Sequence, residues 1–256
     1  MERLWNAAVL AIVLVAAAAQ GYAQTEAALL AQGDRAYQER RSKEALNLYL
    51  RAIEADSSNH EALWKASRSE VDLAEASEKG PALDALLAAA RQHAEAAIRA
   101  RPGDAEGHFA LARALGRQAL SLGARDRIKF SRMIRDEALA ALKINSAHPG
   151  AMHVLGMWNA EIMRVGGLSR VFARTFLGAD GFDLASWEEA QRLLETAARE
   201  DPQRIIHRLD LAGIYADRGD KVRARELYQE VASAPVVEPN DDLYKRQAAE
   251  RLKRLE

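Results

Sequence analysis

The sequence predicts an all-α protein built as a right-handed solenoid of about five helix pairs. About a fifth of the 256 residues are alanine, the strongest helix former. Apolar residues recur at helical spacing along the chain, and almost no stretch alternates as a strand would. Similar strings of small and apolar residues, each followed by a turn rich in Asp, Asn, Ser, Pro or Gly, return several times. Such recurrence indicates a repeat architecture.

The recurring strings resemble the tetratricopeptide repeat (TPR), a helix-turn-helix unit of about 34 residues. They are EALNLYLRAIEADSSN (44–59), RQHAEAAIRARPGD (91–104), RDEALAALKINSAH (135–148) and EEAQRLLETAAREDPQ (188–203). Small residues allow the paired helices to approach, and aromatic rings fill the wedge between repeats. The residues that fit the pattern are Gly33, Ala45, Tyr49, Ala52, Leu155, Gly156, Ala190, Ala197, Pro202, Leu211, Tyr215, Gly219, Ala224 and Tyr228.

The spacing of the repeats predicts insertions. The small-residue position of the second helix falls at Ala45, Ala90, Ile134, Ala190 and Ala224, so the successive gaps are 45, 44, 56 and 34 residues. Only the last gap is a standard repeat, and we expect the extra residues to lengthen helices around 72–88 and 117–130. The fourth repeat should carry a large insertion over about 164–186. Residues 241–256 should form an amphipathic helix that caps the stack of a single domain, 24–256.

A more specific resemblance covers about Ala96 to Tyr228. It depends on RIKFSRMIRDEALAALKIN (127–145), HPGAMHVLGMWNAEIM (148–163), GLSRVFARTFLG (167–178) and SWEEAQRLLETAAREDP (186–202). These segments are similar to the repeat domain of the regulator of microtubule dynamics proteins. The resemblance implies a soluble repeat domain with a groove for a lipid or an apolar peptide, because one animal member holds phospholipid in this domain.

The first 23 residues have the layout of a secretory signal peptide. Arg3 precedes an uninterrupted apolar run from Ala7 to Ala19, and Gly21 and Ala23 supply small residues for cleavage. We therefore expect an exported, periplasmic protein cut after about Ala23. An uncleaved membrane anchor is the alternative, although the run is short for a spanning helix. The chain has no cysteine, so its stability must come from burial without disulfides.

The concave surface of a TPR solenoid is lined by the first helix of each repeat, and two rows of positions point inward. The fifth-position row is Leu30, Trp64, Phe109, His153 and Leu209, and the ninth-position row is Asp34, Arg68, Arg113, Met157 and Gly213. An apolar row beside two arginines suits a ligand with an apolar body and an anionic head, such as a phospholipid or another amphiphile. Alternatively, residues 168–182 fold into the concave side and use the row as core.

Two cationic segments are further candidates for contact with an anionic headgroup or a membrane surface. In the insertion, Arg170 and Arg174 alternate with Phe172 and Phe176, as in an amphipathic helix. Around 125–135, Arg127 and Lys129 belong to the densest basic stretch. The alternatives are an insertion whose apolar side packs on Trp158, and a basic stretch that is simply a solvated helix surface.

Signals for catalysis, metals and nucleic acid are absent from the sequence. The 36 basic residues nearly cancel the 37 acidic ones, which argues against a nucleic-acid binder. The six histidines form no HExxH pair, and there is no GxSxG motif or phosphate-cradling glycine loop. We expect a non-catalytic binding or scaffold module of the cell envelope, without cofactor or metal, that binds a protein or peptide partner. The alternatives are a lipid-binding or lipid-transfer protein, and an enzyme or an accessory subunit of an envelope enzyme.

Overall fold

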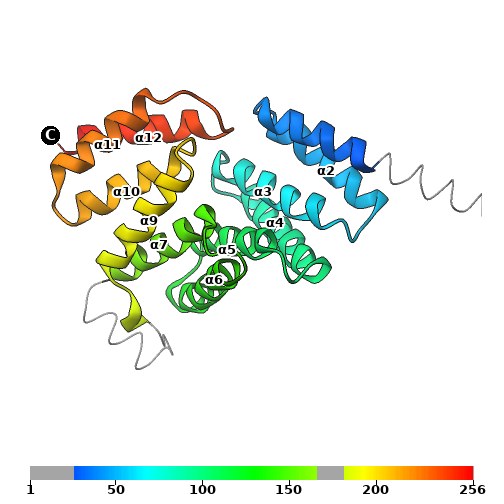
Figure 1. The fold of residues 1–256 in the computed structure, drawn as a ribbon, viewed down its shortest axis with the longest axis horizontal. Helices are drawn as coiled ribbons and strands as arrows, with labels where there is room; N and C mark the ends of the chain where they lie inside the picture. The colour runs from blue at the N-terminus through cyan, green and yellow to red at the C-terminus, as the bar shows by residue number, and fades with distance from the viewer. Residues whose placement is uncertain (1–25, 166–181, 256) are drawn as a thin grey trace, which may run out of the picture.

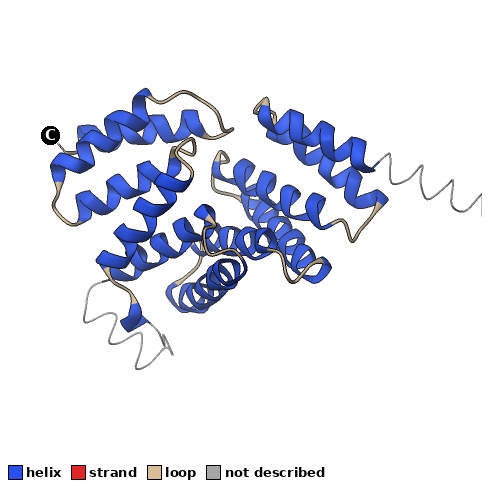
Figure 2. Cartoon of the chain, in the orientation of Figure 1, coloured by secondary structure: helices blue, strands red, loops and turns tan. Residues whose placement is uncertain are grey.

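The computed structural model describes residues 26–165 and 182–255, and in these residues every regular element is a helix (Figures 1 and 2). The predicted all-α TPR solenoid is confirmed. After a helix over residues 26–38, the elements are α2 (Ser42–Ala55), α3 (His60–Glu75), α4 (Pro81–Ala100), α5 (Ala105–Ala119), α6 (Ala124–Ile144), α7 (Pro149–Arg164), the short 3-10 helix η1 (Phe182–Leu184), α9 (Trp187–Glu200), α10 (Ile206–Asp217), α11 (Lys221–Ser233) and α12 (Asp241–Lys253).

Each helix packs against its neighbours along the chain, and the helix pairs follow one another around a curve (Figure 1). The first helices of the pairs are helix 26–38, α3, α5, α7 and α10, and the second are α2, α4, α6, α9 and α11. The lengthened helices are α4, with 20 residues, and α6, with 21, compared with 12 in α10. The extra residues therefore extend the second and third pairs, with their turns at 76–80 and 120–123.

Small residues hold the paired helices together as the repeat pattern requires. The five equivalent positions are all buried, with Ile134 the most exposed at 8%. A Cβ atom added at Gly156 of α7 would lie 3.2 Å from the carbonyl oxygen of Ala190 and 3.1 Å from Leu194 Cγ. Since a backbone oxygen cannot yield as a flexible side chain can, α7 and α9 approach this closely only because residue 156 is glycine.

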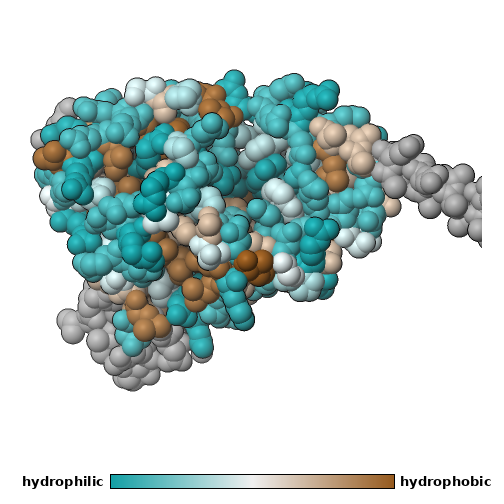
Figure 3. Space-filling view, viewed as in Figure 1, coloured by the Kyte–Doolittle hydropathy of each residue, from teal (hydrophilic) through white to brown (hydrophobic). Residues whose placement is uncertain are grey.

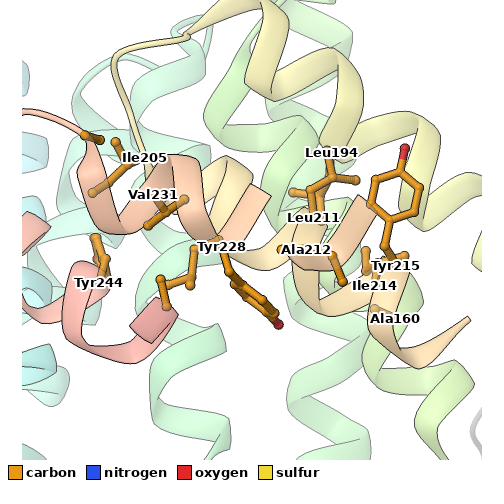
Figure 4. Close-up of a cluster of buried hydrophobic side chains, with 14 of the residues drawn as sticks. Ala160, Leu194, Ile205, Leu211, Ala212, Ile214, Tyr215, Tyr228, Val231 and Tyr244 are labelled. Atoms are coloured by element: carbon orange, nitrogen blue, oxygen red, sulfur yellow. The ribbon is translucent and has the colours of Figure 1, made fainter. Parts of the chain in front are cut away.

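Two large hydrophobic clusters lie in the middle and at the C-terminal end of the solenoid. Figure 4 shows the C-terminal one, to which α9, α10, α11 and α12 contribute Leu194, Leu211, Ala212, Ile214, Tyr215, Tyr228, Val231 and Tyr244. In the other cluster, Trp158 donates from Nε1 to the carbonyl oxygen of Ser131 at 2.9 Å, and Phe182 meets its ring edge-on with the centroids 6.3 Å apart. The chain that follows the insertion therefore folds back onto α7. None of the described helices is long and apolar enough to cross a membrane.

Candidate ligand-binding surface

The inner face of the solenoid consists of the side chains that join one first helix to the next. Tyr37 of helix 26–38 donates to Asp72 of α3 at 2.8 Å, and Arg113 of α5 donates to the same carboxylate at 2.6 Å. Further along, His153 of α7 and His207 of α10 lie with their Nδ1 atoms 2.9 Å apart. The space-filling view shows a hollow near the middle of the molecule whose walls are mostly hydrophilic (Figure 3). Polar and charged groups thus make up much of the inner face.

The expected apolar row divides into reachable and buried residues. Leu30, Trp64 and His153 are partly exposed, whereas Phe109 is 9% exposed and Leu209 is fully buried. The Phe109 ring packs against Gly150, where an added Cβ would lie 2.5 Å from Phe109 Cζ, and the His148 ring lies 4.7 Å away. Phe109 and Leu209 are therefore core residues that join neighbouring helices. The exposed part of this row therefore does not form a continuous apolar lining.

Arg113 of the ninth-position row is already paired. Its guanidinium lies 2.6 Å from the Asp72 carboxylate and 3.5 Å from Glu75. Burial opposes the charge, but the two carboxylates outweigh burial and hold the pKa of Arg113 well above its ordinary value. These ion pairs stabilise the contact between α3 and α5. Because Asp72 and Glu75 already compensate the charge of Arg113, this guanidinium is poorly placed to bind an anionic ligand.

Arg68 of the same row has no carboxylate within ion-pair distance among the described residues. Its guanidinium lies 3.6 Å from the centroid of the Tyr37 ring and 5.2 Å from that of Trp64, and it donates to the Tyr49 hydroxyl at 3.4 Å. Other basic residues of the described first helices and of their surroundings have an acidic partner: Lys65, Arg113, Arg117, Arg164, Arg204 and Arg251. Arg68, held by aromatic rings, is the inner-face cation with capacity for an anionic ligand.

The C-terminal arm, residues 234–255, closes the curve onto the first pairs. Asn240 donates to the carbonyl oxygen of Asp72 at 3.0 Å and to the Glu75 carboxylate at 3.1 Å, and the Tyr244 hydroxyl donates to Glu75 as well. Figure 1 shows the segment before α12 approaching the end of α3. The helix expected as a simple cap therefore also joins the two ends of the solenoid, a role that its amphipathic sequence does not reveal.

A histidine pair occupies the inner face between α7 and α10. His153 Nε2 lies 3.4 Å from the Asp210 carboxylate, which in turn lies 3.6 Å from Arg251. His207 is 1% exposed, and its burial, together with the neighbouring His153, Arg204 and Arg208, lowers its pKa far below 6.5. Among the described residues, no group of three or more His, Cys, Asp or Glu could hold a metal ion. The pair is thus part of the polar packing of this surface.

Comparison with known proteins identifies the family. The family model described as regulator of microtubule dynamics protein 1-3 matches residues 29–256. The chain belongs to this family. The resemblance noted in the sequence is confirmed over nearly the whole length of the domain.

Solved structures confirm the fold of this family member. The thermophilic TPR protein TTC0263 of Thermus thermophilus has a TM-score of 0.64 at 18% identity, with 89% of this chain and 99% of that chain covered. The pilF protein of Pseudomonas aeruginosa has a TM-score of 0.53 at 15% identity, with 92% and 93% covered. A comparison with curated proteins finds no match. At these identities the structural likeness shows the TPR fold alone.

The other predicted contact residues of the family member lie apart from the inner face or beyond the described chain. Met157 is partly buried and packs on the C-terminal cluster. Arg127 and Lys129 are exposed on α6, where Arg127 donates to the carbonyl oxygen of Leu122 at 3.1 Å. The candidates in the insertion lie outside the described residues, as does nearly all of the segment 168–182 that could fill the groove: Arg170, Phe172, Arg174 and Phe176.

The buried His207 predicts a pH dependence of stability. Its pKa is near 6.5 in the unfolded chain and far lower in the folded one, so the unfolded chain binds the extra proton and stability falls as the pH drops through 6.5. We expect the free energy of unfolding to decrease by about 1.4 kcal/mol between pH 7.5 and 5.5 from this group. Urea unfolding of the wild type and His207→Gln at both pH values measures it. An equal decrease in both proteins would contradict the prediction.

Proposed function

We propose that this chain is a non-catalytic protein-interaction module that binds an extended peptide segment of a partner protein on its inner face. The observation that carries the proposal is Arg68, a cation stacked on Tyr37 and Trp64 and without a carboxylate partner among the described residues. Arginine and tryptophan are the side chains that most often dominate protein interfaces. An acidic side chain or terminal carboxylate of the partner would meet Arg68, with an apolar neighbour against Trp64.

The polar inner face supports a peptide over a lipid. An acyl chain needs a continuous apolar lining, yet Phe109 and Leu209 are core residues. An acyl chain laid along the inner face would also strip water from Asp34 and the charges around Arg68 without replacing their hydrogen bonds. A peptide backbone offers both donors and acceptors to such groups. Lipid or amphiphile binding is therefore the alternative, and the same experiment tests it.

Binding of short labelled peptides to the purified protein tests the proposal. Each probe carries one Asp or Glu beside an apolar residue, and its counterpart carries Asn or Gln in the same place. Since a charge-assisted hydrogen bond contributes about 1.5–3 kcal/mol, Arg68→Gln should weaken binding of the acidic probes about tenfold or more. The matched control is Arg51→Gln on the exposed surface of α2, which should bind as the wild type does.

Uptake of a fluorescent phospholipid is measured on the same proteins. Saturable uptake by the wild type, together with equal binding of acidic and amide probes, would contradict the peptide proposal in favour of the lipid alternative. Because Arg68 also stacks on Tyr37, the melting temperature of Arg68→Gln is compared with that of the wild type. Loss of acidic-probe binding in a variant that still melts cooperatively supports the proposal.

We also propose that the module acts in the cell envelope after export. The support is the layout of residues 1–23, with its positive start, apolar run and small residues before the expected cut. N-terminal sequencing of the protein recovered from the periplasm should begin near Gln24. Recovery of the intact N-terminus in the membrane fraction would instead identify an anchor.

A further inference from the structure

We infer that the hollow beside the start of α2 is a second binding site, for a phosphate group. The hollow has a volume of about 580 Å³ and lies between the turn that leads into α2, the C-terminal end of α3 and the segment before α12. Its lining combines three basic side chains with the first residues of a helix. The residues of the turn that line it are Arg40, Arg41, Ser42, Lys43 and Glu44. This site does not depend on the peptide site around Arg68.

The charge balance of the hollow favours an anion. Arg41 is paired with Glu39 and Glu44. The carboxylate of Asp72, which also lines the hollow, accepts from Tyr37 and Arg113. Arg40 and Lys43 are exposed and have no acidic partner among the described residues. Arg41 offsets only one of the two carboxylates it pairs with, so Arg40 and Lys43 leave the hollow with a net positive charge of about one, which suits a phosphate oxyanion.

The start of α2 adds hydrogen-bond donors to these charges. Arg41 precedes the helix, and in the described part of the chain no side chain caps its first N–H groups. Such groups have no partner within the helix and place a partial positive charge at its N-terminus, where phosphates commonly bind.

Ser42 is an independent indication of a ligand. It lines the hollow as the first residue of α2, it is 8% exposed, and its hydroxyl has no hydrogen-bond partner among the residues that the structure describes. Buried polar groups nearly always have a partner, because an unpaired one loses its bond to water without replacement. A phosphate oxygen seated at the helix start would accept from this hydroxyl.

The backbone conformation of Arg40 makes Arg40→Gly a variant that should weaken phosphate binding without destabilising the fold. Its φ is +62°, in the left-handed region that favours glycine. The matching turn between α10 and α11 has Gly219 there, with φ +85°. The two turns share their hydrogen bonds: Arg40 and Gly219 donate three residues back, and the next residues donate five back. Glycine at position 40 would therefore suit the fold better than arginine and remove only the cation.

Titration of the full chain with inorganic phosphate, against chloride at matched ionic strength, tests the site. The wild type and the control Arg51→Gln should bind phosphate saturably by calorimetry and gain melting temperature. Lys43→Gln and Ser42→Ala should bind at least tenfold more weakly. Arg40→Gly should melt at a higher temperature than the wild type without phosphate, yet also bind at least tenfold more weakly.

Two further probes distinguish the source of the phosphate group. Recruitment to vesicles that contain phosphatidic acid, reversed by free phosphate, would identify a lipid headgroup. Binding of glycerol phosphate without recruitment would identify a soluble phosphate ester, and either outcome supports the site. Absence of saturable phosphate binding by the wild type would overturn the inference. Equal phosphate affinity in the wild type, Arg40→Gly and Lys43→Gln would overturn it as well.

Discussion

Replacing Phe109 by aspartate is expected to unfold the protein or to lower its free energy of unfolding by at least about 3–5 kcal/mol. The ring is 9% exposed and fills the space above Gly150 at the start of α7. Aspartate would leave most of that space empty and would place a carboxylate among apolar side chains, which adds a desolvation cost. Urea unfolding followed by far-UV circular dichroism measures the effect.

Phe109→Leu is the matched control, because leucine keeps most of the apolar volume without a charge. It should lower the free energy of unfolding by about 1–1.5 kcal/mol. A folded Phe109→Asp protein with a nearly unchanged unfolding midpoint would show that the ring faces the solvent-filled groove. The row would then line a groove as its position in the repeat suggests.

The helix pairs could be predicted because their cause is local. Small residues at a fixed place in each second helix, such as Ala45 and Ala190, are buried wherever the repeat occurs. The described helices on either side of the expected insertion are α7, which ends at Arg164, and α9, which begins at Trp187. Position in the repeat alone does not predict which side chains of the inward row are exposed in a groove and which are buried in the core. Gly150, directly after Pro149, is the signal that could have indicated a space for the Phe109 ring.

The charge pattern of the inner face could not be read from the sequence. Arg68 and Arg113 occupy the same position of successive repeats, and Asp72 lies four residues after Arg68 on one helix face. This four-residue spacing would allow an intrahelical pair between Arg68 and Asp72. The structure instead pairs Asp72 with Arg113 of the next repeat and places Arg68 against Tyr37. Only the packing of neighbouring repeats decides which arginine is paired with a carboxylate of the protein and which one can pair with a ligand.

The contact between the two ends of the solenoid is even harder to predict from the sequence. Asn240 and Glu75 are 165 residues apart, and no repeat position relates them. Their contact depends on the summed curvature of all the helix pairs between them. A small change in each crossing angle would separate them. The contact is therefore determined by the geometry of the whole solenoid and not by any local sequence pattern.

Asp72→Asn is the second substitution with a large expected effect. The carboxylate of Asp72 is 6% exposed, and it accepts from Arg113 at 2.6 Å and from Tyr37 at 2.8 Å. The variant keeps the shape of the side chain but removes the charge, so the partly buried Arg113 retains only Glu75, at 3.5 Å. Breaking a buried pair in this way costs about 3–5 kcal/mol, because one charge is left uncompensated. Urea unfolding measures the loss.

A double-mutant cycle decides whether the loss comes from the charge or from the shape. Arg113→Met removes the guanidinium while it keeps an unbranched apolar side chain of similar length. If the stranded charge causes the loss, Asp72→Asn with Arg113→Met should be more stable than Asp72→Asn alone, with a coupling of at least about 2 kcal/mol. Additive losses would mean that Asp72 acts through Tyr37 instead. Because Asn240 bonds to the backbone of residue 72, the double variant should also retain the contact between the two ends of the solenoid.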